Sequence, residues 1–76
     1  MTLDQLRIGK CGHIVSVNGK GILRDRLLDM GLTPGTEVMV RRTAPFGDPI
    51  EILLRGYELT LRLEDAKNIE VERAKS

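Results

Sequence analysis

The sequence has almost no aromatic residues, since Trp is absent and the 76 residues include one Phe and one Tyr. It also lacks an excess of either charge: 12 Lys and Arg stand against 11 Asp and Glu, which leaves a net charge of +1. Nucleic-acid-binding surfaces need rings that stack on bases and a basic stripe that neutralises phosphate. Arg41 and Arg42 form the one adjacent basic pair, and Glu37 and Glu51 dilute it. The sequence therefore argues against a nucleic-acid partner.

The single cysteine, Cys11, has no second cysteine with which to form an internal disulfide, which is typical of a protein in a reducing cytoplasm. No run approaches the roughly 18 apolar residues of a membrane span, and no apolar leader follows a basic N-terminus. We therefore expect a soluble, unprocessed, cytoplasmic chain that does not insert into a membrane. Its length predicts one domain over residues 1–76, because domains rarely fall below about 50 residues.

Glycine and proline separate short segments whose apolar periodicity changes along the chain. Apolar residues at three- and four-residue steps predict an amphipathic helix from Ile22 to Met30, ended by Gly31 and Pro34. Residues 3–6 are expected to form one helical turn. Residues 13–17 are rich in β-branched residues between glycines, which indicates a strand, and from residue 37 onward apolar and polar residues alternate, which indicates four more. The expected strands span residues 13–17, 37–41, 50–55, 57–64 and 68–72.

The connections between the expected strands are mostly short. Parallel pairing needs crossovers of a dozen or more residues, so we expect antiparallel pairing, with a tight hairpin at residues 54–57 in which Gly56 takes a positive φ. A small sheet hides more of its edges when it curls. We predict a mainly β fold: a partly open, SH3-like antiparallel barrel of about five strands, with one short helix inserted between the first two. An OB-fold is the nearest alternative, but its helix would lie between the third and fourth strands.

Cys11 and His13 are the residues best suited to chemistry. A thiolate and an imidazole can act as nucleophile and base, but the sequence offers no third group to orient them, so we expect no enzymatic activity. Alternate residues of a strand share a side, and the pair could therefore contribute to a site for Fe²⁺ or Zn²⁺. Two ligands fall short of the four in a structural zinc site. We therefore expect no required cofactor.

Phe46 lies in a connection bounded by Pro45 and Pro49, where few residues are available to bury its ring. Exposed apolar residues on loops of a rigid scaffold commonly bind partners; the alternative is a ring that folds back on its own hairpin. In the predicted helix, Ile22 and Leu28 lie outside the main apolar stripe, and one of them is expected to remain exposed. These features favour a protein-binding function.

Three segments resemble the signature of the FeoA family. They are residues 26–38, in which Met30-Gly31-Leu32 precedes Pro34-Gly35, residues 44–51, which contain Gly47-Asp48-Pro49, and residues 55–62. The resemblance implies a small, cytoplasmic, SH3-like protein of bacterial ferrous iron uptake. It also implies a partner, FeoB, a membrane transporter with a cytoplasmic GTP-binding domain, which the small protein would assist or regulate. Cys11 and His13 lie outside the pattern, so the resemblance does not support a metal site there.

We expect the helix, the turn at residues 31–35 and the Phe46 hairpin to form the docking surface for this partner. The residues expected to bind it are Ile22, Arg26, Leu28, Met30, Pro45, Phe46 and Asp48. By preferring one state of the FeoB cytoplasmic domain, the protein would bias its conformation or nucleotide turnover at the inner face of the membrane. The alternative function is a sensor that itself binds a divalent transition metal ion, with Cys11 and His13 as ligands. The oligomeric state is left open by the sequence.

Overall fold

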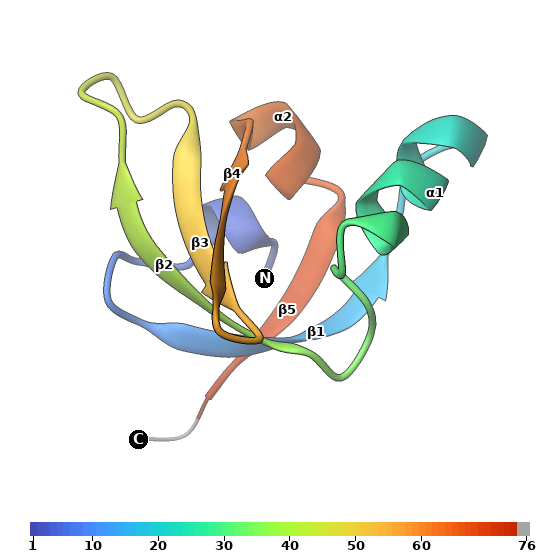
Figure 1. The fold of residues 1–76 in the computed structure, drawn as a ribbon, viewed down its shortest axis with the longest axis horizontal. Helices are drawn as coiled ribbons and strands as arrows, with labels where there is room; N and C mark the ends of the chain where they lie inside the picture. The colour runs from blue at the N-terminus through green and yellow to red at the C-terminus, as the bar shows by residue number, and fades with distance from the viewer. Residues whose placement is uncertain (75–76) are drawn as a thin grey trace.

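The computed structural model describes residues 1–74 of the chain. Five antiparallel strands form one sheet in the order β4-β3-β2-β1-β5, which curls into a partly open barrel (Figure 1). The strands are β1 (Cys11–Val17), β2 (Glu37–Thr43), β3 (Ile50–Leu54), β4 (Tyr57–Leu61) and β5 (Ile69–Arg73). The helices are η1 (Leu3–Gln5, a 3-10 turn), α1 (Gly21–Asp29) and α2 (Leu63–Ala66). The predicted mainly β fold, with a helix between the first two strands, is confirmed.

Two bulges bend the sheet. In the β1–β5 pairing the register shifts between Ile14 and Ser16, and in the β2–β3 pairing it shifts between Val40 and Arg42. A bulge inserts an extra residue into one strand and increases the local twist and bend. This lets a sheet of short strands wrap around one core. The β2 bulge also leaves Arg41 and Arg42 exposed in succession.

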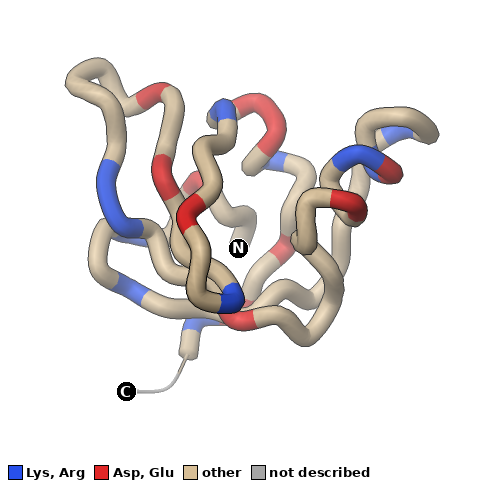
Figure 2. Tube along the Cα trace, viewed as in Figure 1, with Lys and Arg blue, Asp and Glu red and all other residues tan. Residues whose placement is uncertain are grey.

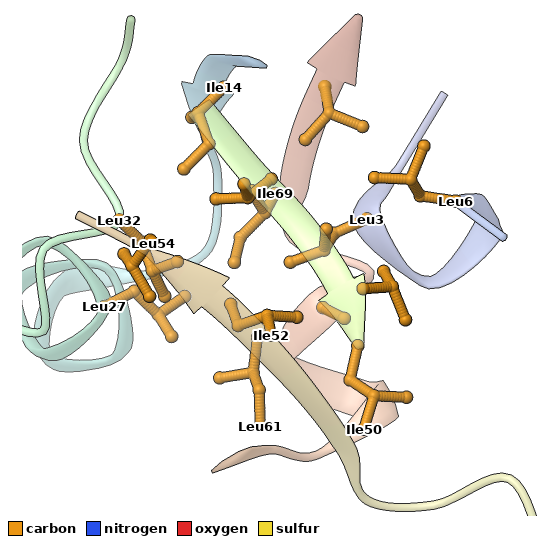
Figure 3. Close-up of a cluster of buried hydrophobic side chains, with 14 of the residues drawn as sticks. Leu3, Leu6, Ile14, Leu27, Leu32, Ile50, Ile52, Leu54, Leu61 and Ile69 are labelled. Atoms are coloured by element: carbon orange, nitrogen blue, oxygen red, sulfur yellow. The ribbon is translucent and has the colours of Figure 1, made fainter. Parts of the chain in front are cut away.

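The core is aliphatic and draws on every helix and strand. In β3 the first, third and fifth residues are buried, as expected for a strand with one face on the core. Figure 3 shows Leu27 of α1 and Leu32 beside Leu54 on one side of the cluster, with Leu3 and Leu6 on the other. Each fully buried Leu contributes about 1.5–3 kcal/mol relative to an exposed one. Burial in this core therefore holds α1 and η1 on the sheet.

The strand expected over residues 57–64 is wrong in its last part, because β4 ends at Leu61 and α2 begins at Leu63. The apolar alternation continues through Leu63 only because this residue packs against the core from the helix. Glu64 and Asp65 occupy the first turn of α2, where negative charge is favourable. The other expected elements are confirmed, with boundaries shifted by one or two residues. None of the helices within residues 1–74 is long and apolar enough to cross a membrane.

The end of α1 is fastened to β4 at Gly31. This glycine has a φ of +98°, the left-handed conformation in which many helices end. The Tyr57 hydroxyl donates a hydrogen bond of 2.5 Å to the carbonyl oxygen of Met30, and a Cβ on Gly31 would come within 2.6 Å of that hydroxyl. Both the backbone angle and the close approach therefore require glycine at this position.

We expect Gly31→Ala to lower the free energy of unfolding by about 2–5 kcal/mol, because left-handed backbone at alanine and a forced contact both cost energy. Gly35→Ala is the matched control. Gly35 has a φ of +90° but no atom within 4 Å of its Cβ position, so only the backbone cost of about 1–2 kcal/mol applies. Denaturant titration of both variants measures the difference. Equal losses would show that the approach of Tyr57 is unimportant.

Candidate protein-binding surface

Loop 44–49, α2 and α1 lie along one side of the molecule (Figure 1). We call this surface the rim. The loop that carries Phe46 is at one end of the rim, α1 is at the other, and α2 lies between them. A helix that the sequence analysis missed therefore separates the two parts of the expected docking surface.

Two polar contacts join the three parts of the rim. The backbone N–H of Leu63 donates a hydrogen bond of 3.0 Å to Asp48 Oδ1, which satisfies a donor in the first turn of α2. Arg26 Nη2 of α1 lies 3.7 Å from Asp65 Oδ2 of α2, and the Asp65 side chain is only 16% exposed. Arg26 and Asp48 are both predicted from the sequence to bind another protein. In the structure each contacts a residue of α2 in the same chain.

Phe46 is 99% exposed, so its ring does not fold back on the hairpin, and that alternative is wrong. Two backbone hydrogen bonds order the loop: Ala44 N–H donates to the Pro49 carbonyl at 2.9 Å, and Gly47 N–H donates to the Ala44 carbonyl at 2.7 Å. Pro45 is exposed beside the ring. A large ring held in water by an ordered loop can enter a pocket of another protein with little loss of conformational entropy.

The apolar residues of α1 divide into two groups. Ile22, in the first turn, is 86% exposed, which confirms that one residue outside the main stripe remains in water. Leu28 and Met30 are half-buried and pack against the core. Ile22 is therefore available to a partner, whereas Leu28 and Met30 chiefly hold α1 on the barrel.

The β3–β4 hairpin closes, as predicted, with a two-residue turn, in which Arg55 and Gly56 have φ values of +49° and +82°. From this turn the Arg55 guanidinium donates to the hydroxyls of Thr33 and Thr36, both at 3.1 Å. Thr36 is buried. The hairpin thus holds the segment between α1 and β2. Sequence analysis missed this role of Arg55, because no local pattern relates it to threonines so far along the chain.

An open groove of about 670 Å³ lies at the opposite end of β3 from loop 44–49. Its lining includes the apolar side chains of Met39 and Leu53 and the opposite charges of Glu37 and Arg55. The sequence did not predict this groove, since its walls come from three strands and two turns. Cys11 is the one nucleophilic thiol in the lining, which contains no histidine to activate it.

Cys11 and His13 alternate along β1 but have different neighbours. His13 Nε2 lies 3.1 Å from Glu72 Oε2 of β5, whereas Cys11 lies opposite Met39 of β2. Within residues 1–74, no group of three or more His, Cys, Asp or Glu side chains could hold a metal ion. A metal site at Cys11 and His13 stays a prediction, with two ligands from this chain.

Opposite charges are interspersed over the molecule (Figure 2). Arg42 Nε lies 2.5 Å from Glu51 Oε2, and Arg41 and Arg42 lie 3.7 and 4.0 Å from the Glu58 carboxylate. The expected dilution of this basic pair by Glu51 is confirmed, and Glu58 adds to it. Exposed ion pairs contribute little to stability, but these place a carboxylate beside each arginine of the pair.

The FeoA domain family model matches residues 1–73 of the chain. The chain is also 42% identical over 72 residues to an Fe(2+) transport protein A/Fe(2+) transporter FeoB fusion protein of Porphyromonas gingivalis. That similarity covers 95% of this chain but 8% of the relative, so the chain spans only a small part of the fusion protein's length.

Solved structures have the same fold. A FeoA-like protein of Clostridium acetobutylicum is 36% identical, with a TM-score of 0.92 over 100% of this chain and 88% of that chain. A zinc-complexed FeoA of Stenotrophomonas maltophilia, described as a procaryotic SH3 domain protein, is 26% identical, with a TM-score of 0.84 over 95% of this chain and 89% of that chain. The SH3-like prediction is confirmed, in preference to the OB-fold.

We expect Asp48→Ala to lower the free energy of unfolding by about 0.5–2 kcal/mol, because the Leu63 N–H loses its acceptor. Asp48→Asn retains an oxygen at that position and should lose less. Glu64→Ala is the control. It removes a carboxylate from the first turn of α2 but leaves Asp48 in place as the acceptor of the Leu63 N–H. Thermal unfolding compares the three variants. If Glu64→Ala were as damaging as Asp48→Ala, charge near α2 and not the hydrogen bond would account for the loss.

Proposed function

This chain belongs to the FeoA domain family, which is associated with ferrous iron transport, and we propose that it is a small cytoplasmic accessory protein that binds a FeoB-type membrane transporter. The observation that carries the proposal is Phe46, a 99% exposed ring on a hydrogen-bonded loop. The Porphyromonas gingivalis relative joins its transport protein A and FeoB parts in one polypeptide, and such linkage keeps two binding modules at a high effective concentration. We place the contact on the cytoplasmic GTP-binding domain of the transporter.

The rim supports contact with a protein surface. Phe46 and Ile22 stand at its two ends, 99% and 86% exposed, and α2 is fixed between them through Asp48 and Arg26. In protein interfaces, a few apolar anchors surrounded by polar groups provide most of the binding energy. In this proposal Phe46 and Ile22 are the anchors, and the polar residues of α2 contact the surface between the two pockets that receive them.

The proposed role is regulation rather than reaction, in keeping with a family of small accessory domains. A ligand that prefers one state of a GTP-binding domain shifts the population toward that state. The protein would in this way bias the conformation or the nucleotide turnover of the transporter without taking part in hydrolysis. The contact needs no bound cofactor, because apolar burial and hydrogen bonds provide its energy.

We expect Phe46→Ala to raise the Kd for the purified GTP-binding domain of a FeoB-type transporter by about 10- to 100-fold, the cost of truncating an aromatic anchor. The Tm of the free protein should not change, because the ring is exposed and supports no packing. Isothermal titration calorimetry, with the domain loaded with a GTP analogue or with GDP, measures the Kd and the nucleotide preference.

Ile8→Ala is the matched control for this experiment. Ile8 is 57% exposed but lies in the connection between η1 and β1, which is away from the rim (Figure 1). The proposal requires that Ile8→Ala bind as tightly as the wild type. A folded Phe46→Ala variant with wild-type affinity would contradict the role of the rim.

A further inference from the structure

The two edge strands of the sheet differ in how their outer backbone groups are satisfied. N-terminal residues cover the outer edge of β5: Val71 N–H donates to the Met1 carbonyl at 2.8 Å, the Met1 amino group donates to the Val71 carbonyl at 3.3 Å, and Thr2 bridges to Glu70. Within residues 1–74, no segment pairs with the outer edge of β4. β4 is therefore the open edge of the sheet.

The register of the β3–β4 hairpin determines which backbone groups of β4 are free. Its two-residue turn makes Leu54 and Tyr57 a hydrogen-bonded pair, so every second residue of β4, starting from Tyr57, directs its N–H and C=O toward β3. Glu58 and Thr60 direct theirs away from the sheet, and both residues are exposed. Their unpaired groups form a template for another strand.

β4 lacks the features that usually protect an edge. Edge strands are commonly blunted by lysine, proline or bulges. β4 contains neither lysine nor proline, and its register with β3 is unbroken, in contrast to the bulged β1–β5 and β2–β3 pairings. Its one charged residue, Glu58, lies 3.7 and 4.0 Å from Arg41 and Arg42 of the same chain and stays half-exposed, so its carboxylate can also face a cation across the edge. The edge is thus able to accept a strand.

The sequence along this edge is complementary to its own reverse. Residues 58–62 are Glu, Leu, Thr, Leu and Arg. We propose that β4 pairs antiparallel with β4 of a second copy of this chain, with Thr60 opposite Thr60 of the second copy and Glu58 opposite Arg62 of the second copy. Arg62 has extended backbone, with φ −73° and ψ 148°. Its carbonyl already accepts the N–H groups of Asp65 and Ala66, so Arg62 can add its N–H and its side chain to the pairing. The contact is two-fold symmetric, and the same surface serves both copies.

Other registers are less favourable. The outward-directed groups must face one another, which allows registers centred on Glu58, Leu59, Thr60 or Leu61. The register centred on Leu61 places Thr60 opposite Arg62 and pairs no opposite charges. A register centred on Glu58 places two carboxylates opposite each other, and one centred on Leu59 places Glu58 opposite Thr60 without charge pairing. The register centred on Thr60 forms a threonine pair and two pairs of opposite charge, both of which stabilise adjacent strands.

The contact is small, and this sets its strength. A stable interface uses roughly 20–30 residues on each side, whereas this pairing centres on residues 58–62. A weak dimer that dissociates on dilution follows. Its formation depends on backbone hydrogen bonds and on charge complementarity more than on apolar burial.

Sedimentation equilibrium over a series of protein concentrations, combined with amide hydrogen exchange on the same samples, tests this proposal. We expect a reversible dimer, and slower exchange of the Glu58 and Thr60 amides as the concentration rises. Thr60→Pro leaves the β3–β4 ladder intact, because the Thr60 N–H points away from β3. It removes the central donors of the dimer and is expected to raise the dimer Kd roughly tenfold or more.

Charge exchange tests the register. Glu58→Arg and Arg62→Glu each place like charges opposite one another in a homodimer, so each variant alone should dimerise about tenfold more weakly. An equimolar mixture of the two variants should recover wild-type association, since every 58–62 pair of the heterodimer then has opposite charges. The recovery cannot come from changes within one chain, such as loss of the Glu58 ion pairs, because mixing alters neither chain.

A protein that remains monomeric at every concentration, with a freely exchanging Thr60 amide, overturns the proposal. A dimer whose Kd is unchanged by Thr60→Pro also overturns it, because another surface must then hold the two copies together. The same is true if the mixture of Glu58→Arg and Arg62→Glu associates no more tightly than either variant alone. If the Thr60 amide is protected only when the GTP-binding domain of a FeoB-type transporter is added, the edge receives a strand of that partner and not of a second copy.

Discussion

The hydrogen bond from the Tyr57 hydroxyl to the Met30 carbonyl joins the end of α1 to the β3–β4 hairpin, and the position of this end of the helix depends on it. Leu27 is fully buried and Leu28 packs against the core beside it, and the hydrogen bond adds a polar contact at the point where the helix ends. Gly31 permits the approach of Tyr57, and Arg55 of the same hairpin holds the segment that follows. The place of Ile22 at one end of the rim follows from these contacts.

α2 depends on its surroundings in the same way. A helix of four residues is far too short to be stable by itself. It forms because Ala66 is buried, because Asp48 accepts the Leu63 N–H, and because Arg26 pairs with Asp65. These contacts make loop 44–49, α2 and α1 one connected surface. Such a surface loses less conformational entropy on binding than a set of independent loops would.

The curvature that wraps this sheet around a small core leaves β4 and β5 unjoined. The N-terminal residues cover the edge of β5, while the edge of β4 presents the backbone of Glu58 and Thr60 to solvent. The rim and the β4 edge use different residues, so contact with a transporter and pairing with a second copy can be tested separately. Pairing through β4 would present two rims, and two linked sites bind more tightly than one when both can be engaged.

The sequence by itself determined the features that depend on neighbouring residues. Period-two alternation indicated β2, β3 and β5, glycine marked the end of α1 and the β3–β4 turn, and the prolines beside Phe46 indicated a connection with few residues to bury its ring. Tertiary structure alone decided that α2 exists, that Arg26 and Asp48 have partners within the chain, that Arg55 holds Thr33 and Thr36, and which sheet edge stays open. The physical reason is that periodicity and turn chemistry are local, whereas the partner of a polar side chain depends on which distant segments the core brings together.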